Sequence, residues 1–348
     1  MGEKNWLNDS EKRVNFDSLY TSKKEIGRRV YQPVGSSCFT FHCTDLNQRE
    51  CAVKALQKRA KDYVKTVTLG PLLRLEHKNV VALKEVFESD THIFMVSKFV
   101  DGKPLFQYLA SLDVLSEDLM ATAIRQIVDA LVYLHYFDII HRDLKPSNLL
   151  LTKEGDNLNV QVSDAAFSTV IGSDMELELV NGDYTYTAPE IFLSHDYGAP
   201  VDLWALGVIL FIMACGEEPF KRDNDMDAFR AIQRADYAFD APGWKDISMH
   251  CHDLIRRLLA VDPAIRFTAL QASRHKWVTG EETKSVILPQ LPQRLQNFNQ
   301  RCAERAKYWR SVKSLNPDDR LEEELRVRGD CGVALRHRDD DLEVPRSL

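Results

Sequence analysis

The pattern of hydrophobic and polar positions changes once along the chain. Between residues 23 and 100, short apolar runs of strand length alternate with polar turns. The clearest of these runs lie at residues 39–45, 50–56 and 92–100. We therefore expect a small strand-rich lobe in this part of the chain.

After residue 101 the apolar positions recur at helical spacing instead. Residues 116–137 show this spacing best, and Ser116 with the two acids after it forms a helix N-cap signal. The same spacing predicts further helices at residues 200–215, 226–235, 248–260 and 268–275. The expected fold class is α+β, with a strand-rich lobe at 23–100, a helical lobe at 101–278 and a polar extension at 1–22.

Composition, net charge and the longest apolar run exclude several classes of protein. The chain has 348 residues, 44% hydrophobic and 28% charged, which is an ordinary globular mixture and argues against a wholly disordered chain. The net charge of -7 gives no sign of a general nucleic-acid binder. The longest apolar run, residues 204–215, is too short to span a membrane, so we expect it to form a buried helix.

Cysteine usage indicates a reducing compartment. The seven cysteines are odd in number and form no C-x-x-C pair, so neither a disulfide framework nor a structural zinc site is expected. The polar N-terminus carries no signal-peptide core. We expect a cytoplasmic location, with the nucleus also open.

The run from His141 to Asn148, HRDLKPSN, carries the strongest chemical signal. Phosphoryl transfer to a hydroxyl needs a carboxylate to orient the hydroxyl, a cation near the phosphoryl group, and ligands for Mg²⁺. Asp143, Lys145 and Asn148 supply one of each within six residues. Asp164, after a strand-like run, is a candidate second metal ligand, and Lys54 is a candidate to hold nucleotide phosphates.

At this point the chain resembles the eukaryotic protein kinase family, over roughly residues 23–278. The motifs that carry the resemblance are Ala52-Val53-Lys54, HRDLKPSN at 141–148, Ala188-Pro189-Glu190, Asp202-Leu203-Trp204, Arg266 and His275-Lys276-Trp277-Val278. The resemblance implies a two-lobed kinase fold that binds ATP and Mg²⁺ between its lobes. It also implies a serine/threonine kinase acting on a protein substrate, in which Glu190 pairs with Arg266 and Asp202 braces the catalytic loop.

The resemblance also implies roles for single residues. Asp143 and Lys145 match the catalytic positions, and Asn148 and Asp164 match the Mg²⁺ ligands. The implied ATP-binding residues are Gly35, Ala52, Lys54, Ser97, Phe99 and Val100. Because kinases of this kind usually carry a larger residue at the position of Ser97, we expect space behind the adenine.

Other positions depart from the family pattern. Pro33 and Cys38 stand at two of the three glycine positions of the glycine-rich loop, where only Gly35 remains. Thr68 stands at the place of the helix glutamate that should pair with Lys54. These changes affect groups that position ATP.

The remaining departures follow the catalytic loop. Asp164 is followed by Ala165 and Ala166 instead of phenylalanine and glycine. Asp183 replaces a threonine of the activation segment, and Leu179 replaces an activating phosphothreonine. Since the groups that do the chemistry remain, two hypotheses stand: a weak or atypical active kinase, or a pseudokinase that acts as a signalling or scaffold module.

After the kinase-like region the composition of the chain changes again, first to basic and then to acidic. We expect a regulatory segment at residues 285–315, which is basic and amphipathic over 294–315, and an acidic flexible tail at 316–348. The nearest resemblance within the kinases is the calmodulin-regulated group, where a helix at this place blocks the cleft and binds calmodulin. Calmodulin is acidic with Met-lined grooves, so it suits a basic helix with bulky anchors. The candidate anchors are Leu295, Phe298, Tyr308, Trp309 and Val312.

The alternative is a solvated basic helix that packs its aromatic residues on the domain itself. Under the regulatory hypothesis, removing everything after about Gly280 should expose the cleft and raise activity.

Overall fold

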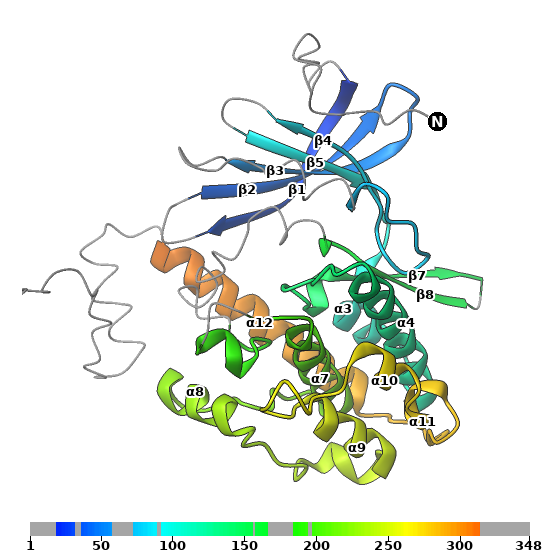
Figure 1. Cartoon of the computed structure of the whole chain (residues 1–348), viewed down its shortest axis with the longest axis vertical. Coiled ribbons are helices and arrows are strands. Elements are labelled where there is room, and N and C mark those ends of the chain that lie inside the picture. Colours follow the sequence, from blue (N-terminus) through cyan, green and yellow to red (C-terminus); the bar gives the residue numbers. More distant parts are fainter. Residues whose placement is uncertain are drawn as a thin grey trace, which may run out of the picture.

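The computed structural model describes residues 19–31, 36–57, 72–88, 92–155, 157–165, 184–193 and 197–313. Figure 1 shows a lobe of β-strands above a larger lobe of helices. This arrangement confirms the predicted α+β class.

The first lobe is a five-stranded antiparallel sheet of order β1-β2-β3-β5-β4 (Figure 1). Its strands are β1 (Tyr20–Tyr31), β2 (Ser36–Asp45), β3 (Glu50–Gln57), β4 (Leu83–Glu88) and β5 (His92–Lys98). The three predicted runs are confirmed as β2, β3 and β5. Strands β1 and β4 lack a clear apolar alternation, and β1 begins inside the expected polar extension, because pairing with β2 overrides its weak local preference.

The second lobe contains a small three-stranded sheet and the helices. The sheet strands are β6 (Lys103–Pro104), β7 (Leu149–Glu154) and β8 (Asn157–Val162). The α-helices are α3 (Leu105–Ala110), α4 (Glu117–Tyr136), α7 (Pro200–Cys215), α8 (Asp225–Arg234), α9 (Met249–Leu258), α10 (Ala269–Ser273), α11 (Lys276–Thr279) and α12 (Leu291–Lys313). Short 3-10 helices lie at Pro146–Asn148, Pro189–Phe192 and Pro242–Asp246.

The predicted helices are confirmed with ends that differ by a few residues. Ser116 caps α4, since its side chain accepts a hydrogen bond from the backbone N–H of Leu119 at 3.3 Å. Helix α7 occupies the whole predicted range and ends at Gly216, whose φ of 80° suits glycine. No helix within the described ranges is long and apolar enough to cross a membrane, and α7 is a buried core helix as predicted.

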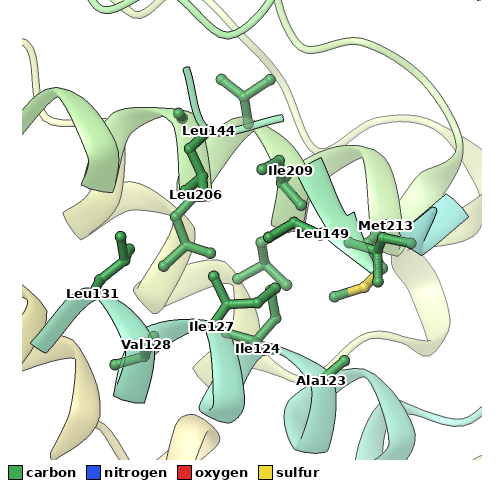
Figure 2. Close-up of a cluster of buried hydrophobic side chains, with 14 of the residues drawn as sticks. Ala123, Ile124, Ile127, Val128, Leu131, Leu144, Leu149, Leu206, Ile209 and Met213 are labelled. Carbon is green, nitrogen blue, oxygen red and sulfur yellow. The ribbon is translucent and has the colours of Figure 1, made fainter. Parts of the chain in front are cut away.

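Both ends of the catalytic loop are anchored in the core of the second lobe. Figure 2 shows Leu144 and Leu149 among apolar side chains that come from α4 and α7. Both leucines are buried. Because they flank the loop that bears Lys145 and Asn148, core packing fixes the loop on either side.

The first half of α12 belongs to the same core. Leu291, Leu295 and Phe298 are buried, and α12 packs against α3 and α7. The ring of Phe298 meets Phe106 of α3 edge-to-face with centroids 5.4 Å apart, and Asn299 Nδ2 donates to the Phe106 carbonyl at 3.0 Å.

The close approach of α12 also depends on a glycine. A side chain at Gly216 would place its Cβ 2.5 Å from the Cβ of Arg294, which is too close for ordinary contact. Removing everything after Gly280 would therefore strip core residues from the lobe as well as any inhibitory segment. The expectation that this truncation raises activity stays a prediction, and a loss of stability is expected beside it.

Candidate active site

The catalytic loop is held by one buried carboxylate. Asp202, in the first turn of α7, accepts hydrogen bonds from the backbone N–H groups of His141 and Arg142, each at 2.8 Å. The ring Nε2 of His135 lies 2.8 Å from the same carboxylate. These contacts confirm that Asp202 braces the loop and hold Arg142 at a positive φ of 64°.

His141 fixes the inner side of the loop. Its Nδ1 accepts from the backbone N–H of Asp143 at 3.3 Å, so the proton lies on Nε2, which donates to the Ser163 carbonyl at 2.8 Å. The side chain is fully buried. This links the loop to the residue that precedes Asp164.

Asp143, Lys145 and Asn148, which the sequence singles out, lie together on this loop. Lys145 Nζ lies 2.5 Å from Asp143 Oδ1. The Nδ2 of Asn148 donates to the backbone carbonyl of Asp143 at 2.7 Å and to its Oδ2 at 3.0 Å. The carboxylate is thus oriented from two sides by a cation and by an amide donor.

Lys54 and Asp164 form an ion pair between the two lobes. Lys54 lies on β3, opposite Thr40 of β2 and Met95 of β5. Asp164 follows β8 with a positive φ of 71°. Both side chains are largely buried, which strengthens their attraction.

The donor set suits Mg²⁺ held together with phosphates. Within the described ranges no group of three or more His, Cys, Asp or Glu side chains could hold a metal ion. Mg²⁺ is commonly bound by one or two carboxylates plus the oxygens of a substrate phosphate. Asp164 offers carboxylate oxygens, and Asn148, whose Nδ2 donates to Asp143, offers its Oδ1 as an acceptor.

The residues expected around the adenine come together on β3, on β5 and directly after β5. Ala52 and Ser97 are partners across β3 and β5, and Ser97 Oγ donates to the Ala52 carbonyl at 3.3 Å. Phe99 stacks on His42 of β2 with ring centroids 4.0 Å apart. Val100 follows it and is partly buried.

Some of the departures from the family pattern lie in the described residues. Cys38 is buried on β2, opposite Leu56 of β3. Ala165, next to Asp164, is also buried. The other departures, at Pro33, Thr68, Ala166, Leu179 and Asp183, lie outside the described residues, as does the retained Gly35.

A second ion pair anchors the Ala188-Pro189-Glu190 motif. Arg266 donates to both carboxylate oxygens of Glu190, at 2.6 and 2.9 Å, as the sequence predicted. The guanidinium of Arg142 lies 5.6 Å from the ring centroid of Tyr197. Burial raises the pKa of the Tyr197 phenol, and the charge of Arg142 opposes that rise.

Sequence reasoning missed two contacts that matter for the site. The first is the contact of His135 with Asp202. His135 lies at the end of α4, 67 residues before Asp202 in the chain, and no local sequence pattern indicates that the two meet. The contact of Arg305 on α12 with Glu218 after α7 spans 87 residues.

Comparisons with known proteins fit this geometry. The family described as Protein kinase domain matches residues 20–278. The human calcium/calmodulin-dependent protein kinase type IV is 35% identical over 298 residues, which cover 85% of this chain and 62% of that protein. The human type 1B enzyme is 39% identical over 233 residues, covering 66% of this chain and 68% of that protein.

A third relative is aligned over most of its own length. Myosin light chain kinase A of Dictyostelium discoideum is 34% identical over 278 residues, which cover 79% of this chain and 92% of that protein. The chain spans about three fifths of the length of the type IV relatives it matches.

Proposed function

Since the chain belongs to the protein kinase family and is similar to its calmodulin-dependent members, we propose that it transfers phosphate from ATP to serine or threonine hydroxyls of a protein substrate. The observation that carries the proposal is the cluster of Asp143, Lys145 and Asn148. A carboxylate held by a cation and an amide donor is arranged to accept a hydroxyl proton.

Each residue has one role in this proposal. Asp143 orients the acceptor hydroxyl and takes its proton, while Lys145 neutralises the charge that develops nearby. Lys54 binds nucleotide phosphates, and its contact with Asp164 keeps both groups at the junction of the lobes. Asn148 and Asp164 would hold Mg²⁺, which supplies charge neutralisation for the phosphates when bound.

The pseudokinase hypothesis rests on different residues. Pro33, Thr68 and Asp183 depart from the family pattern, and Ala165 replaces the phenylalanine after Asp164. Positioning provides much of the rate in phosphoryl transfer, so the proposed activity is slow compared with that of a kinase with all its motifs.

Two measurements separate the hypotheses. Thermal unfolding with and without Mg-ATP reports nucleotide binding, since a ligand of the folded state raises stability by mass action. Incorporation of labelled phosphate into a generic basic peptide then reports turnover. Stabilisation together with incorporation supports the kinase, whereas stabilisation without incorporation supports the pseudokinase.

We also propose that residues 294–315 bind calcium-loaded calmodulin. The buried positions Leu295 and Phe298 make the first half of α12 a part of the core, so the proposal rests on the second half. Cations on it suit an acidic partner. Trp309 is the largest apolar residue of that half and is proposed as the main anchor.

Calorimetric titration of the full chain with calmodulin tests this second proposal. We expect binding with calcium and none with a chelator. Trp309→Ala should weaken binding about tenfold or more, because a buried aromatic anchor is commonly worth at least that much. No heat of binding with calcium would favour the solvated-helix interpretation.

A further inference from the structure

Two arginines of α12, Arg301 and Arg305, contact the turn after α7. Arg301 Nη2 lies 3.0 Å from Glu217 Oε2 and also donates to the Gly216 carbonyl at 3.1 Å. Arg305 Nη2 lies 2.8 Å from Glu218 Oε1. The arginines are four residues apart, so they lie on the same face of the helix.

The two carboxylates differ in their surroundings. The side chain of Glu217 is 49% exposed, whereas that of Glu218 is 12% exposed. An exposed carboxylate that loses its cation is solvated by water at little cost. A largely buried carboxylate that loses its cation is strongly disfavoured and has to move toward water.

Glu218 also reaches the end of the activation segment, residues 184–187. Thr185 Oγ1 donates to Glu218 Oε1 at 3.5 Å. On the same segment, Tyr184 Oη donates to Asp225 Oδ1 at 2.7 Å. Burial and the hydrogen bond to Asp225 raise the pKa of the Tyr184 phenol, while Arg305 opposes this, so the phenol remains a donor.

These residues lead directly into the Ala188-Pro189-Glu190 motif. The backbone N–H of Thr187 donates to the Tyr184 carbonyl at 3.0 Å and closes a turn within the segment. Glu190 is anchored by Arg266. The turn at 184–187 is therefore fixed at its C-terminal side by Arg266 and on its flank by Glu218.

We infer that Arg305 and Glu218 form a link through which α12 holds residues 184–187 of the activation segment in place. When Arg305 leaves, the poorly solvated Glu218 turns outward, and Thr185 loses its acceptor. An acidic partner that captures the second half of α12 would release the segment in this way. The link goes beyond the proposed function, because it requires neither turnover nor calmodulin.

The neighbouring pair provides a matched control within the same helix. Arg301 and Glu217 make an ion pair of nearly equal length, and among the described residues no hydrogen bond joins that pair to Thr185. If the ion pairs merely fasten α12 to the lobe, loss of either pair should have the same effect. If the link exists, only loss of the Arg305 pair should loosen residues 184–187.

Hydrogen exchange on the full chain, without nucleotide or calmodulin, distinguishes these cases. The reporter is the peptide that contains the amide of Thr187. The variants are Arg305→Gln and Glu218→Ala, with Arg301→Gln and Glu217→Ala as controls. We expect exchange about tenfold faster in the first two and unchanged in the controls, since local opening follows the loss of local contacts.

Equal effects in all four variants, or unchanged exchange in Arg305→Gln, would overturn the link. Arg305 is partly exposed, so we expect Arg305→Gln to fold like the parent. Its exchange rate therefore tests the link even if Glu218→Ala unfolds the protein. Since no variant is assayed for phosphate transfer, the result is independent of the proposed activity.

Discussion

Lys54 on β3 and Asp164 after β8 form an ion pair that joins the strand lobe to the helical lobe. The family pattern led us to expect a helix glutamate as the partner of Lys54, and Thr68 stands at that place. The contact places the cation proposed to bind phosphate beside a candidate Mg²⁺ ligand. Under our proposal, nucleotide and metal therefore bind together at this pair.

This contact predicts how Mg-ATP stabilises the protein. At a concentration of about 100 times Kd, Mg-ATP should raise the free energy of unfolding by about 2.7 kcal/mol. Lys54→Met should abolish the gain. Asp164→Asn should make the effect of ATP independent of Mg²⁺, because the metal loses a carboxylate. Denaturant titration of the three proteins checks this, and a full Mg²⁺ effect in Asp164→Asn would exclude that residue as a ligand.

A second prediction concerns Ser97. Ligands of the ATP site that carry a bulky group should bind the parent protein, and Ser97→Met should weaken them about tenfold, since overfilling a packed site costs 1–3 kcal/mol. Ser97→Ala serves as the control, because it removes the hydrogen bond to Ala52 without filling space. Competition binding measures all three proteins, and equal affinity for Ser97→Met would contradict the placement.

A third prediction follows from the buried half of α12. Ending the chain after Gly280 removes Leu291, Leu295 and Phe298 from the core, which should lower the free energy of unfolding by about 5 kcal/mol or more. Ending it after Gln300 keeps these residues and should cost less, because among the described residues it removes two ion pairs and the partly buried Cys302 in place of three fully packed core side chains. Chemical denaturation compares the two truncated chains. Equal stability would mean that α12 contributes nothing to the core.

The pH dependence of stability provides a fourth prediction. His252 is buried against Phe239 and Trp244, and neither ring nitrogen has a hydrogen-bond partner within the described ranges. Burial, and then the charges of Arg256 and Lys284, lower its pKa. The unfolded chain therefore binds a proton more readily than the folded protein does. The stability that His252 contributes is complete above about pH 6.5 and is lost as the pH falls toward the lowered pKa.

The test compares variants across that range. For the parent, the contribution of His252 should fall by up to about 1.4 kcal/mol per pH unit below pH 6.5. His252→Phe should lose this part of the slope, whereas His250→Gln, at an exposed position on the same helix, should keep it. A parent and a His252→Phe variant with parallel profiles would refute the assignment.

The sequence predicted the features that are local. The residues of HRDLKPSN are adjacent in the chain, so their spacing already implies that Asp143, Lys145 and Asn148 meet. The helix cap at Ser116 is local in the same sense. The contact of Lys54 with Asp164 depends on how the lobes come together, and no short pattern encodes it.

The amphipathic pattern of α12 shows a different limit. The sequence pattern favours Leu295 and Phe298 as candidate anchors for a partner, whereas the structure places them in the protein's own core. An apolar stripe on a basic helix has the same spacing whether it packs inside the molecule or against another protein. Only the tertiary contacts with α3 and α7 separate the two cases.

Our proposal makes Asp143 the group that orients the acceptor hydroxyl and takes its proton during phosphate transfer. The most direct test measures transfer from labelled ATP to a generic basic peptide by the full chain and by Asp143→Asn, at matched occupancy of Mg-ATP. We expect measurable transfer by the parent. In the variant we expect a loss of about 100-fold or more, with nearly unchanged stability and nucleotide binding, because only the proton acceptor is removed. Equal transfer by both proteins, or none by the parent at full nucleotide occupancy, would contradict it.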